Sequence, residues 1–187
     1  MARRPTRQAI LDAAVTVAAR RGISGASMDE VAEVAQVAKG SLYYNFAGKD
    51  ALFAEVLRGG FVRLVDAVSA ARAGRSGGDA LRSVATATMS LLQAHPELAK
   101  IMAAELFRTD RPWGDALAPV RGEVTVHFRD VLREVRAERG EDPAAVTEVS
   151  GAALFGALAF AVLDWLLFHP EQDVQDVVEQ ALVVVGG

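Results

Sequence analysis

The stretch SMDEVAEVAQVAKGSLYYNFAGKDAL, residues 27–52, decides the fold because it is typical of two short helices around a tight turn. Ser27 followed by Glu30 has the spacing of a capping box, in which both side chains satisfy free N–H groups at a helix start. A helix is therefore predicted from Met28, and its apolar pattern is interrupted at Gln36, where a turn is expected. The predicted apolar stripe consists of Val31, Val34 and Ala35.

A second helix is predicted from Lys39 to Phe46. At about 100° per residue, Leu42 and Phe46 share one face, while Gly40 and Tyr44 point the opposite way. Glycine weakens a helix by about 1 kcal/mol relative to alanine. A partner that approaches the helix closely at Gly40 would explain why glycine occurs there. Two short helices with a polar, aromatic outer face are typical of a helix-turn-helix that enters DNA. The alternative is that the tyrosines are half-buried packing residues of a small bundle.

The outer face supplies the predicted DNA contacts, which fall into two groups. Phosphate contacts position a protein on DNA, whereas contacts with base edges specify the sequence. We assign Ser27, Tyr44 and Lys49 to the phosphates. We assign Lys39, Ser41 and Tyr43 to the base edges, with Gly40 and Asn45 on the same surface.

Residues from Thr6 to about Phe53 resemble the DNA-binding region of the TetR family of transcriptional regulators. The resemblance is carried by Gly22, Ser27, Val31, Ala32, Ala35, Val37, Gly40, Leu42, Tyr43, Phe46, Lys49 and Leu52. The rest of the chain resembles the family only in length and helical pattern. The resemblance implies a homodimer that binds an inverted-repeat operator, represses transcription, and is released by a small-molecule inducer.

Three positions depart from the family pattern. Gln36 stands where a turn glycine is usual, and Ala38 stands where a hydroxyl or acidic residue usually starts the next helix. A left-handed Gln36 would cost about 1–2 kcal/mol, and an alanine cap forfeits about 1 kcal/mol. Asp29 replaces a basic residue of some members; an acid there either accepts from cytosine N4 or favours its helix N-terminus, and the second explanation is preferred. The competing hypothesis is therefore a helical dimeric interaction or ligand-binding protein that has lost specific DNA binding.

Charge is distributed unevenly along the chain. Residues 1–49 hold seven Lys or Arg against four Asp or Glu, a balance of +3, which leaves −7 for residues 50–187 of the total of −4. Only the N-terminal part therefore suits a polyanion. Its MARRPTRQ start has no apolar core behind the arginines, so no export signal is predicted and a cytoplasmic location is expected. The chain has no cysteine, which excludes disulfides and thiolate metal sites.

The remaining pattern predicts an all-α fold of about nine helices. We predict a helix-turn-helix DNA-binding domain over residues 1–49 and a helical ligand-binding and dimerisation domain over residues 50–187. Gly22 is expected to end the first helix. Gly59-Gly60 falls within the fourth helix, either because a neighbouring helix crosses closely there or because the helix bends to transmit motion. The first explanation is preferred.

Residues 144–168 are strongly apolar and invite a membrane interpretation. We reject it, because the segment is rich in alanine and glycine, contains Asp164, lacks basic flanks, and is short for a crossing of about 20 residues. Its small residues, Gly151 among them, allow close helix contacts. A homodimer would cover the apolar surface of the last two helices. The predicted interface consists of Gly156, Ala157, Phe160, Val178 and Leu182.

No catalytic site, metal site or cofactor is predicted, because His95, His127 and His169 are scattered without acidic or metal-ligating partners at useful spacing. The family resemblance implies a pocket for an apolar or aromatic molecule, although sequence cannot separate a lined cavity from a filled core. The predicted lining is Met102, Leu106, Phe107, Trp113, Val124, Phe128, Phe155 and Trp165, with Arg121 and His127 as polar contacts.

Overall fold

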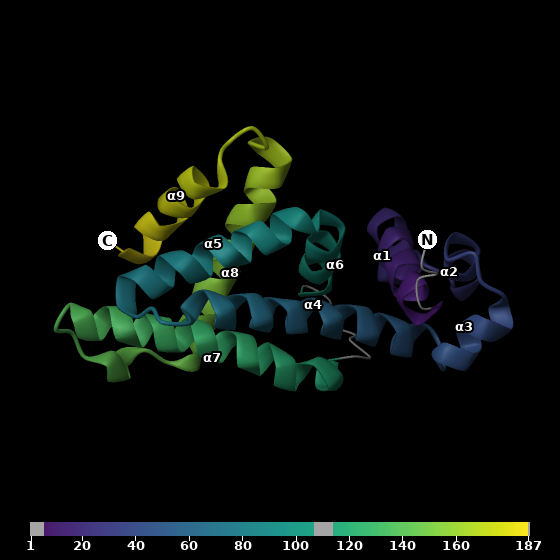
Figure 1. Ribbon diagram of the computed structural model, residues 1–187, viewed down its shortest axis with the longest axis horizontal. Helices are drawn as coiled ribbons and strands as arrows, with labels where there is room; N and C mark the ends of the chain where they lie inside the picture. The colour runs from purple at the N-terminus through teal and green to yellow at the C-terminus, as the bar shows by residue number, and fades with distance from the viewer. Residues whose placement is uncertain (1–5, 107–113, 187) are drawn as a thin grey trace. The chain divides into compact units, whose positions relative to one another are not determined.

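The computed structural model describes residues 6–106 and 114–186 and is all-α (Figure 1). Nine α-helices and one 3-10 turn occur in these two ranges, with no strand among them, which confirms the predicted fold class. They are α1 (Thr6–Gly25), α2 (Met28–Val34), α3 (Lys39–Asn45), α4 (Lys49–Arg72), α5 (Gly77–Ala94), α6 (Pro96–Leu106), α7 (Gly114–Glu138), η1 (Pro143–Ala145), α8 (Glu148–Phe168) and α9 (Val174–Gly186).

Contacts between helices divide the chain into two compact units. The first comprises Met1–Gly60 and Glu97–Ala118, and the second comprises Phe61–Pro96 and Pro119–Gly187. The boundary predicted after residue 49 falls at the start of α4, inside the first unit. Each unit has its own buried apolar residues.

The first unit begins with α1, whose buried face contains Ile10, Ala14, Val17 and Ala18. Gly22 has φ 69° and ψ 164°, a conformation that interrupts the helix and that glycine adopts without steric cost. The prediction that Gly22 ends the regular helix is confirmed, although one further helical turn follows it. α1 packs against α2, and α2 packs against α3.

The glycine pair in α4 does not interrupt the helix, which runs without a break from Lys49 to Arg72. A Cβ atom on Gly60 would lie 3.0 Å from Sδ of Met102 and 3.1 Å from Cδ2 of Leu98, both on α6. The expected close crossing of a neighbouring helix is therefore confirmed at Gly60. A Cβ on Gly59 would meet no described atom within 4 Å, so Gly59 has no such role.

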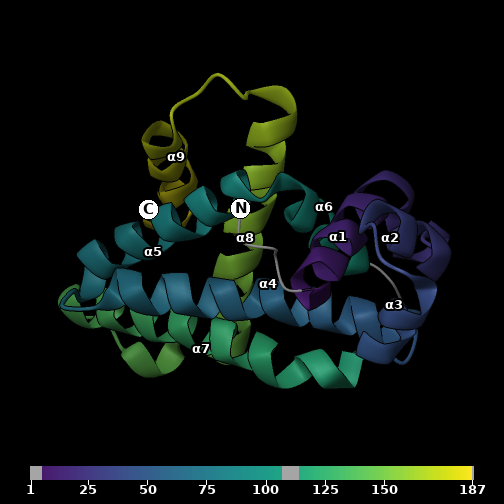
Figure 2. The same cartoon turned by 45° about the vertical axis from the view of Figure 1, so that its right-hand side comes forward.

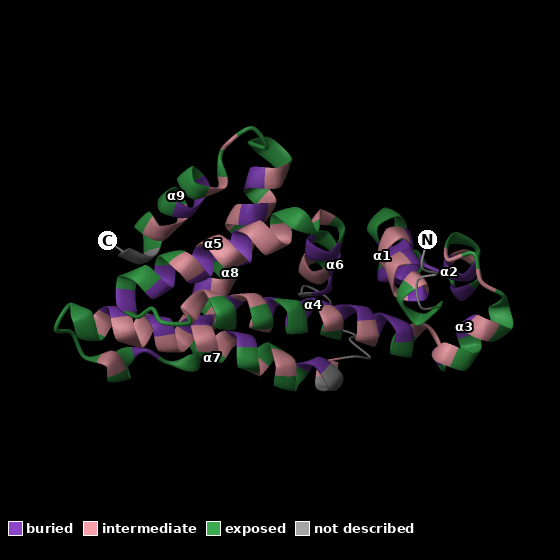
Figure 3. Cartoon of the chain, viewed as in Figure 1, coloured by how far each residue is buried: buried purple, intermediate pink, exposed green. Residues whose placement is uncertain are grey.

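The second unit is built around α5, which contacts both α8 and α9, while α8 and α9 contact each other. Both ribbon views show α9 running beside α5 (Figure 1, Figure 2). Figure 3 shows buried residues on each of these three helices. The largest fully buried side chains of this unit include Trp165, Phe128, Leu64, Met89 and Leu158.

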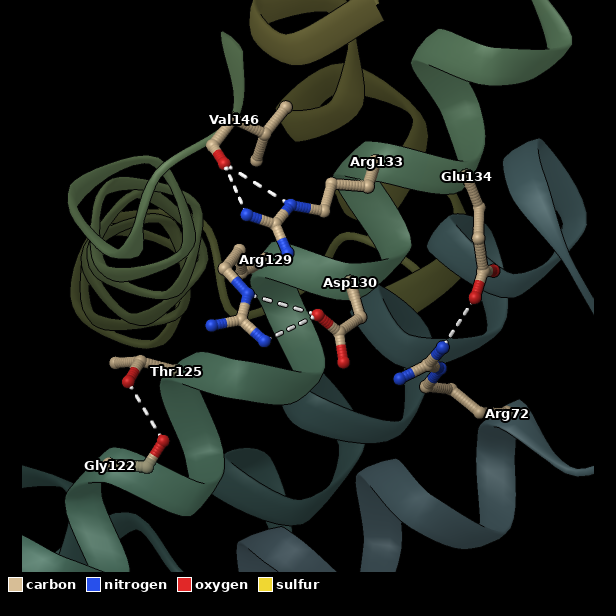
Figure 4. A network of polar contacts seen from close by, with 8 residues as sticks. All are labelled: Arg72, Gly122, Thr125, Arg129, Asp130, Arg133, Glu134 and Val146. Carbon is tan, nitrogen blue, oxygen red and sulfur yellow. Dashed lines mark hydrogen bonds and ion pairs between the residues drawn. The ribbon is translucent and has the colours of Figure 1, made fainter. Parts of the chain in front are cut away.

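Carboxylates of α7 determine where α5 begins. Glu134 accepts a hydrogen bond from the N–H of Gly77 at 3.2 Å, and Glu138 accepts one from the N–H of Gly78 at 2.9 Å. These contacts satisfy N–H groups that a helix start leaves unpaired. Glu134 also binds Arg72 at 2.5 Å (Figure 4). α5 therefore starts at Gly77.

Arginines of α7 hold the connection to α8. Nε and Nη2 of Arg133 donate to the carbonyl of Val146 at 3.2 and 3.0 Å, as Figure 4 shows. Gly140 has φ 71°, which explains why α7 ends just before it. Beyond the connection, Gly151 of α8 packs directly against the backbone of α7, which confirms the expected close helix contact there.

By length and composition alone, α8 could cross a membrane. It nevertheless carries part of the core of the second unit, because Leu154, Leu158, Val162 and Trp165 are buried inside the protein. The Nε1 of Trp165 donates to the carbonyl of Gln172 at 3.1 Å. A protein-facing side on this helix favours the interpretation of a core helix.

Candidate nucleic-acid interface

The two short helices of residues 28–45 are held by buried apolar side chains on α2 and α3. Val31 and Leu42 are fully buried, and Phe46 follows them into the core. Ser27 caps α2, since its Oγ accepts from the N–H of Glu30 at 3.2 Å. The other half of the predicted capping box is not found among the described contacts, because the Glu30 carboxylate lies 3.2 Å from Nε of Arg21 instead.

The predicted apolar stripe of α2 is wrong at one position. Val34 is exposed, and Ala32 lies on the buried face together with Met28 and Val31. Ala35 is only half-buried. The difference arises because α2 is only two turns long, so the position of α1 and α3 selects which apolar residues lie inside.

The turn between α2 and α3 contains Gln36 and Ala38, two of the positions that depart from the family pattern. Gln36 adopts φ 55° and is the one non-glycine residue with positive φ in the described ranges. The N–H of Val37 donates to the carbonyl of Ala32 at 3.0 Å and closes the turn. Ala38 occupies the N-cap of α3 and supplies no side-chain hydrogen bond. Both positions therefore carry the predicted energetic cost.

The outer face of α3 is large, polar and open. Tyr44 is 92% exposed and Tyr43 is 52% exposed, so neither is the half-buried packing residue of the alternative interpretation. A Cβ on Gly40 would meet no described atom within 4 Å, so no intramolecular packing explains this glycine. Ser41 is half-buried, and its carbonyl accepts from Nδ2 of Asn45 at 2.8 Å.

Two lysines stand at the ends of this face. Lys49 is the first residue of α4, as proposed for a phosphate contact, and its Nζ donates to the carbonyl of Ser24 at 2.6 Å. This bond ties the last turn of α1 to the start of α4. Lys39 is the first residue of α3, and its Nζ lies 2.7 Å from Oδ2 of Asp29. The hydrogen bond and the charge of Asp29 raise the pKa of Lys39 above its usual 10.5.

Sequence reasoning missed two charged contacts of this unit. Asp29 was expected to favour the N-terminus of its own helix or to accept from cytosine, and its pairing with Lys39 across the turn was not foreseen. Arg7 of α1 lies 3.0 Å from Glu55 of α4, and its guanidinium stacks 5.2 Å from the ring centroid of Phe46. Glu55 also binds Arg58, which, with Arg7, lowers the Glu55 pKa below 4.5. In the sequence, the one signal for either contact was the opposite charge of the two residues. Many other pairs of residues have opposite charges, so this signal could not identify these contacts.

The predicted ligand-pocket residues fall into three groups. Val124, Phe128 and Trp165 are buried in the second unit, where the Phe128 and Phe155 rings lie 5.5 Å apart between centroids. Met102 is half-buried in the first unit beside Gly60. The side chain of Leu106, and Phe107 and Trp113 entirely, lie outside the described residues.

The two proposed polar contacts differ in their surroundings. Arg121 is exposed on α7, so we leave it out of the proposed lining. His127 is half-buried, and its Nδ1 is buried without a hydrogen-bond partner in the part of the chain that the structure describes. Burial and the positive charge of Arg72 lower the pKa of His127 below 6.5, which keeps the ring neutral at neutral pH.

The described surface also has an open groove of about 440 Å³ between α4, α5 and α9. Its lining shares no residue with the predicted pocket. Arg82 in the groove is paired with Glu179, and Arg75 donates to the carbonyl of Ala71. The Glu179 carboxylate thus compensates the positive charge of Arg82, which an anionic ligand would need.

The predicted dimer surface is largely open on α8 and α9. Gly156 and Ala157 are exposed, Phe160 is 70% exposed, and Leu182 is half-buried. Val178 is fully buried within its own chain, so we leave it out of the proposed interface. The same two helices expose further large apolar side chains, which are Val149, Leu167, Phe168, Val183 and Val184.

Known proteins share both the motif and the fold. The sequence profile described as bacterial regulatory proteins, tetR family, matches residues 10–56. The HTH-type transcriptional repressor SCO4008 of Streptomyces coelicolor is 30% identical over 167 residues, which cover 89% of this chain and 80% of that protein.

Solved structures with the same fold span nearly the whole chain. The fatty acid degradation regulator FadR from Bacillus halodurans has a TM-score of 0.83 at 22% identity, covering 100% of this chain and 98% of that one. The transcriptional regulator FadR from Bacillus subtilis, solved in complex with stearoyl-CoA, has a TM-score of 0.80 at 19% identity, covering 95% and 96%. The chain therefore belongs to the TetR family of DNA-binding transcriptional regulators.

Proposed function

We propose that this regulator binds an inverted-repeat operator as a homodimer, represses transcription, and is released when an apolar small molecule binds its second unit. The outer face of α3 carries the proposal, because Tyr43 and Tyr44 are exposed and Gly40 has no packing role. Repression is supported by the similarity over most of the chain to a Streptomyces coelicolor repressor. Action on chromosomal DNA places the protein in the cytoplasm, and regulation by binding requires no catalysis or cofactor.

Three residues are proposed to position the protein on phosphates. Lys49 uses one N–H on the carbonyl of Ser24, and its ammonium group keeps two further donors for a phosphate. Ser27 accepts from the N–H of Glu30, so its own hydroxyl hydrogen is free to donate to the DNA backbone. Tyr44 is almost fully exposed, which suits its phenol to the same role.

Recognition of the DNA sequence is assigned to the rest of the α3 face. Lys39 can donate to guanine O6 and N7, and Tyr43 and Ser41 can reach base edges or thymine methyl groups. Gly40 lets the backbone approach the DNA closely, while Asn45 supports the face through its bond to Ser41. The geometry of these donors supports direct readout in the major groove.

The homodimer is proposed to form through α8 and α9. Exposed apolar side chains on both helices, including Phe160, support this choice, because large exposed apolar patches on a soluble protein usually mark an interface. A two-fold dimer would place two copies of α3 in successive major grooves about 34–36 Å apart. The preferred DNA site should therefore be an inverted repeat.

The inducer is proposed to occupy the core of the second unit near Val124, Phe128, Phe155 and Trp165. His127 supports this placement, because a buried nitrogen without a partner is costly and a hydrogen-bonding group on the ligand would satisfy it. Release requires that the ligand favour a conformation of the dimer with mismatched α3 spacing, since equal affinity for both states shifts nothing.

One experiment tests DNA binding directly. Random DNA is selected with the purified protein, sequenced, and then titrated at increasing salt concentration. We expect an inverted repeat whose affinity falls steeply with salt, as for a protein that neutralises several phosphates. Recovery of no preferred sequence would favour the competing hypothesis of a helical protein that has lost specific DNA binding.

A second experiment tests the ligand. Thermal stability and operator release are measured with a panel of apolar compounds, with stearoyl-CoA as the first probe, because a structural relative was solved with it. Phe128→Ala and Trp165→Ala should change the response to any compound that stabilises the parent. His127→Phe should weaken ligands with a polar group, whereas the matched change at the exposed His169 should not.

A further inference from the structure

Asp29 and Lys39 form a charged pair on the surface that is proposed to face DNA. Asp29 lies in the first turn of α2, and Lys39 is the first residue of α3. Lys39 Nζ and Asp29 Oδ2 are 2.7 Å apart, and the two side chains remain 66% and 62% exposed. The contact thus joins both helices of the motif at their solvent-facing side.

The fold does not need this pair. Exposed ion pairs contribute little to stability, because water competes for both charges. The two helices already pack against each other, and Val31 of α2 and Leu42 of α3 are fully buried. A role in the complex with DNA therefore explains the pair better than a role in folding.

The pair also changes what Lys39 can recognise. A lysine alone attracts any phosphate, but the carboxylate of Asp29 cancels its charge and repels phosphate oxygens. A neutral pair releases few counterions from DNA and gains little from the sequence-independent attraction. Its donors and acceptors, however, remain available for hydrogen bonds with bases.

We infer that Asp29 and Lys39 act together as one reading unit for a G·C base pair, an inference that rests on the proposed function. Lys39 Nζ has three N–H groups, of which one is directed to Asp29 and two remain for guanine O6 and N7. The other carboxylate oxygen of Asp29 accepts from cytosine N4. Asp29 is thus a specificity-determining residue that also prevents Lys39 from binding phosphate.

The test measures affinity and its salt dependence for the selected operator and for its versions with each G·C pair replaced by A·T. For the parent, one replacement per half-site should weaken binding roughly 10- to 100-fold, as expected for a good base contact. Asp29→Asn should reduce that preference, tighten binding to unrelated DNA, and add about three- to fourfold to the affinity lost between 50 and 200 mM salt.

Two further variants distinguish the effect of the contact between Asp29 and Lys39 from a general effect of charge. Lys39→Met in the Asp29→Asn background should return the salt dependence to that of the parent while the base preference stays lost. Glu33→Gln removes one exposed negative charge from the same helix, and Glu33 has no polar side-chain partner among the described contacts. This control should leave the preference at the G·C pair unchanged.

The outcomes distinguish this inference from the proposed function. If the parent selects no operator, the proposed function fails. If the parent binds an inverted repeat but Asp29→Asn keeps its G·C preference and its salt dependence, only the reading unit is overturned. The same holds if Glu33→Gln reproduces every effect of Asp29→Asn, because general charge would then explain the result.

Discussion

A Cβ atom on Gly151 of α8 would lie 2.5 Å from the carbonyl oxygen of Thr125 on α7. It would also lie 2.8 Å from the backbone nitrogen of Arg129. Backbone atoms cannot move aside like a flexible side chain. This crossing therefore fixes the distance between α7 and α8, and α8 carries part of the proposed dimer interface.

Gly151→Ala should destabilise the protein by about 1–3 kcal/mol, because the added methyl group overpacks the crossing. Gly122→Ala in α7 is the matched control, since its Cβ would meet no described atom within 4 Å. That control should be neutral or stabilise the helix by up to about 1 kcal/mol. Urea unfolding of both variants checks the prediction, and equal stabilities would show that α7 and α8 do not cross this closely.

Gln36→Gly should stabilise the protein by up to about 1 kcal/mol. The left-handed φ of 55° costs a residue with a Cβ atom about 1–2 kcal/mol, a cost that glycine avoids. Part of this gain in stability is lost, because glycine has greater conformational freedom in the unfolded chain. Gln36→Ala keeps the Cβ atom and should give no comparable gain. Thermal unfolding measures both, and a destabilised glycine variant would contradict the turn geometry.

Lys49→Ala should weaken binding to all DNA sequences alike. Loss of one phosphate contact should lower the slope of log affinity against log salt by about one unit. Lys100→Ala, at an exposed position of α6, controls for the change in net charge. Binding titrations at several salt concentrations check the prediction, and an unchanged slope would remove Lys49 from the contact surface.

Stability should fall as the pH drops below about 6.5, in part because of His127. The folded protein holds the pKa of His127 below that of the unfolded chain, so the unfolded state takes up a proton first. The loss is at most about 1.4 kcal/mol per pH unit and is smaller here because the ring is partly solvated. His127→Phe should flatten the pH dependence of unfolding below 6.5, while His169→Phe should not.

Ala157→Glu should yield monomers that bind the operator weakly. The substitution places a charge on the exposed face of α8, where the proposed partner would bury it without a counter-charge. Ala94→Glu, at the exposed end of α5, is the control. Sedimentation measures the oligomeric state, and intact Ala157→Glu dimers would place the interface elsewhere.

Local signals were readable from the sequence alone. The cap at Ser27, the left-handed Gln36, the uncapped Ala38 and the helix end at Gly22 each depend on a few neighbouring residues. Backbone sterics and short-range hydrogen bonds act the same way in any fold. The exposure of Tyr43 and Tyr44 also followed from helical periodicity, because Leu42 and Phe46 had to lie inside.

Tertiary structure decided which distant groups meet. The sequence contained Asp29 and Lys39, but only the crossing of α2 and α3 brings them together. Likewise, α7 supplies Glu134 to the start of α5, far away in the chain. Val178 belongs to the core because α9 packs against α5, although its helix spacing suited an interface equally well. Side-chain period selects a face of a helix, whereas the packing of neighbouring helices determines what that face contacts.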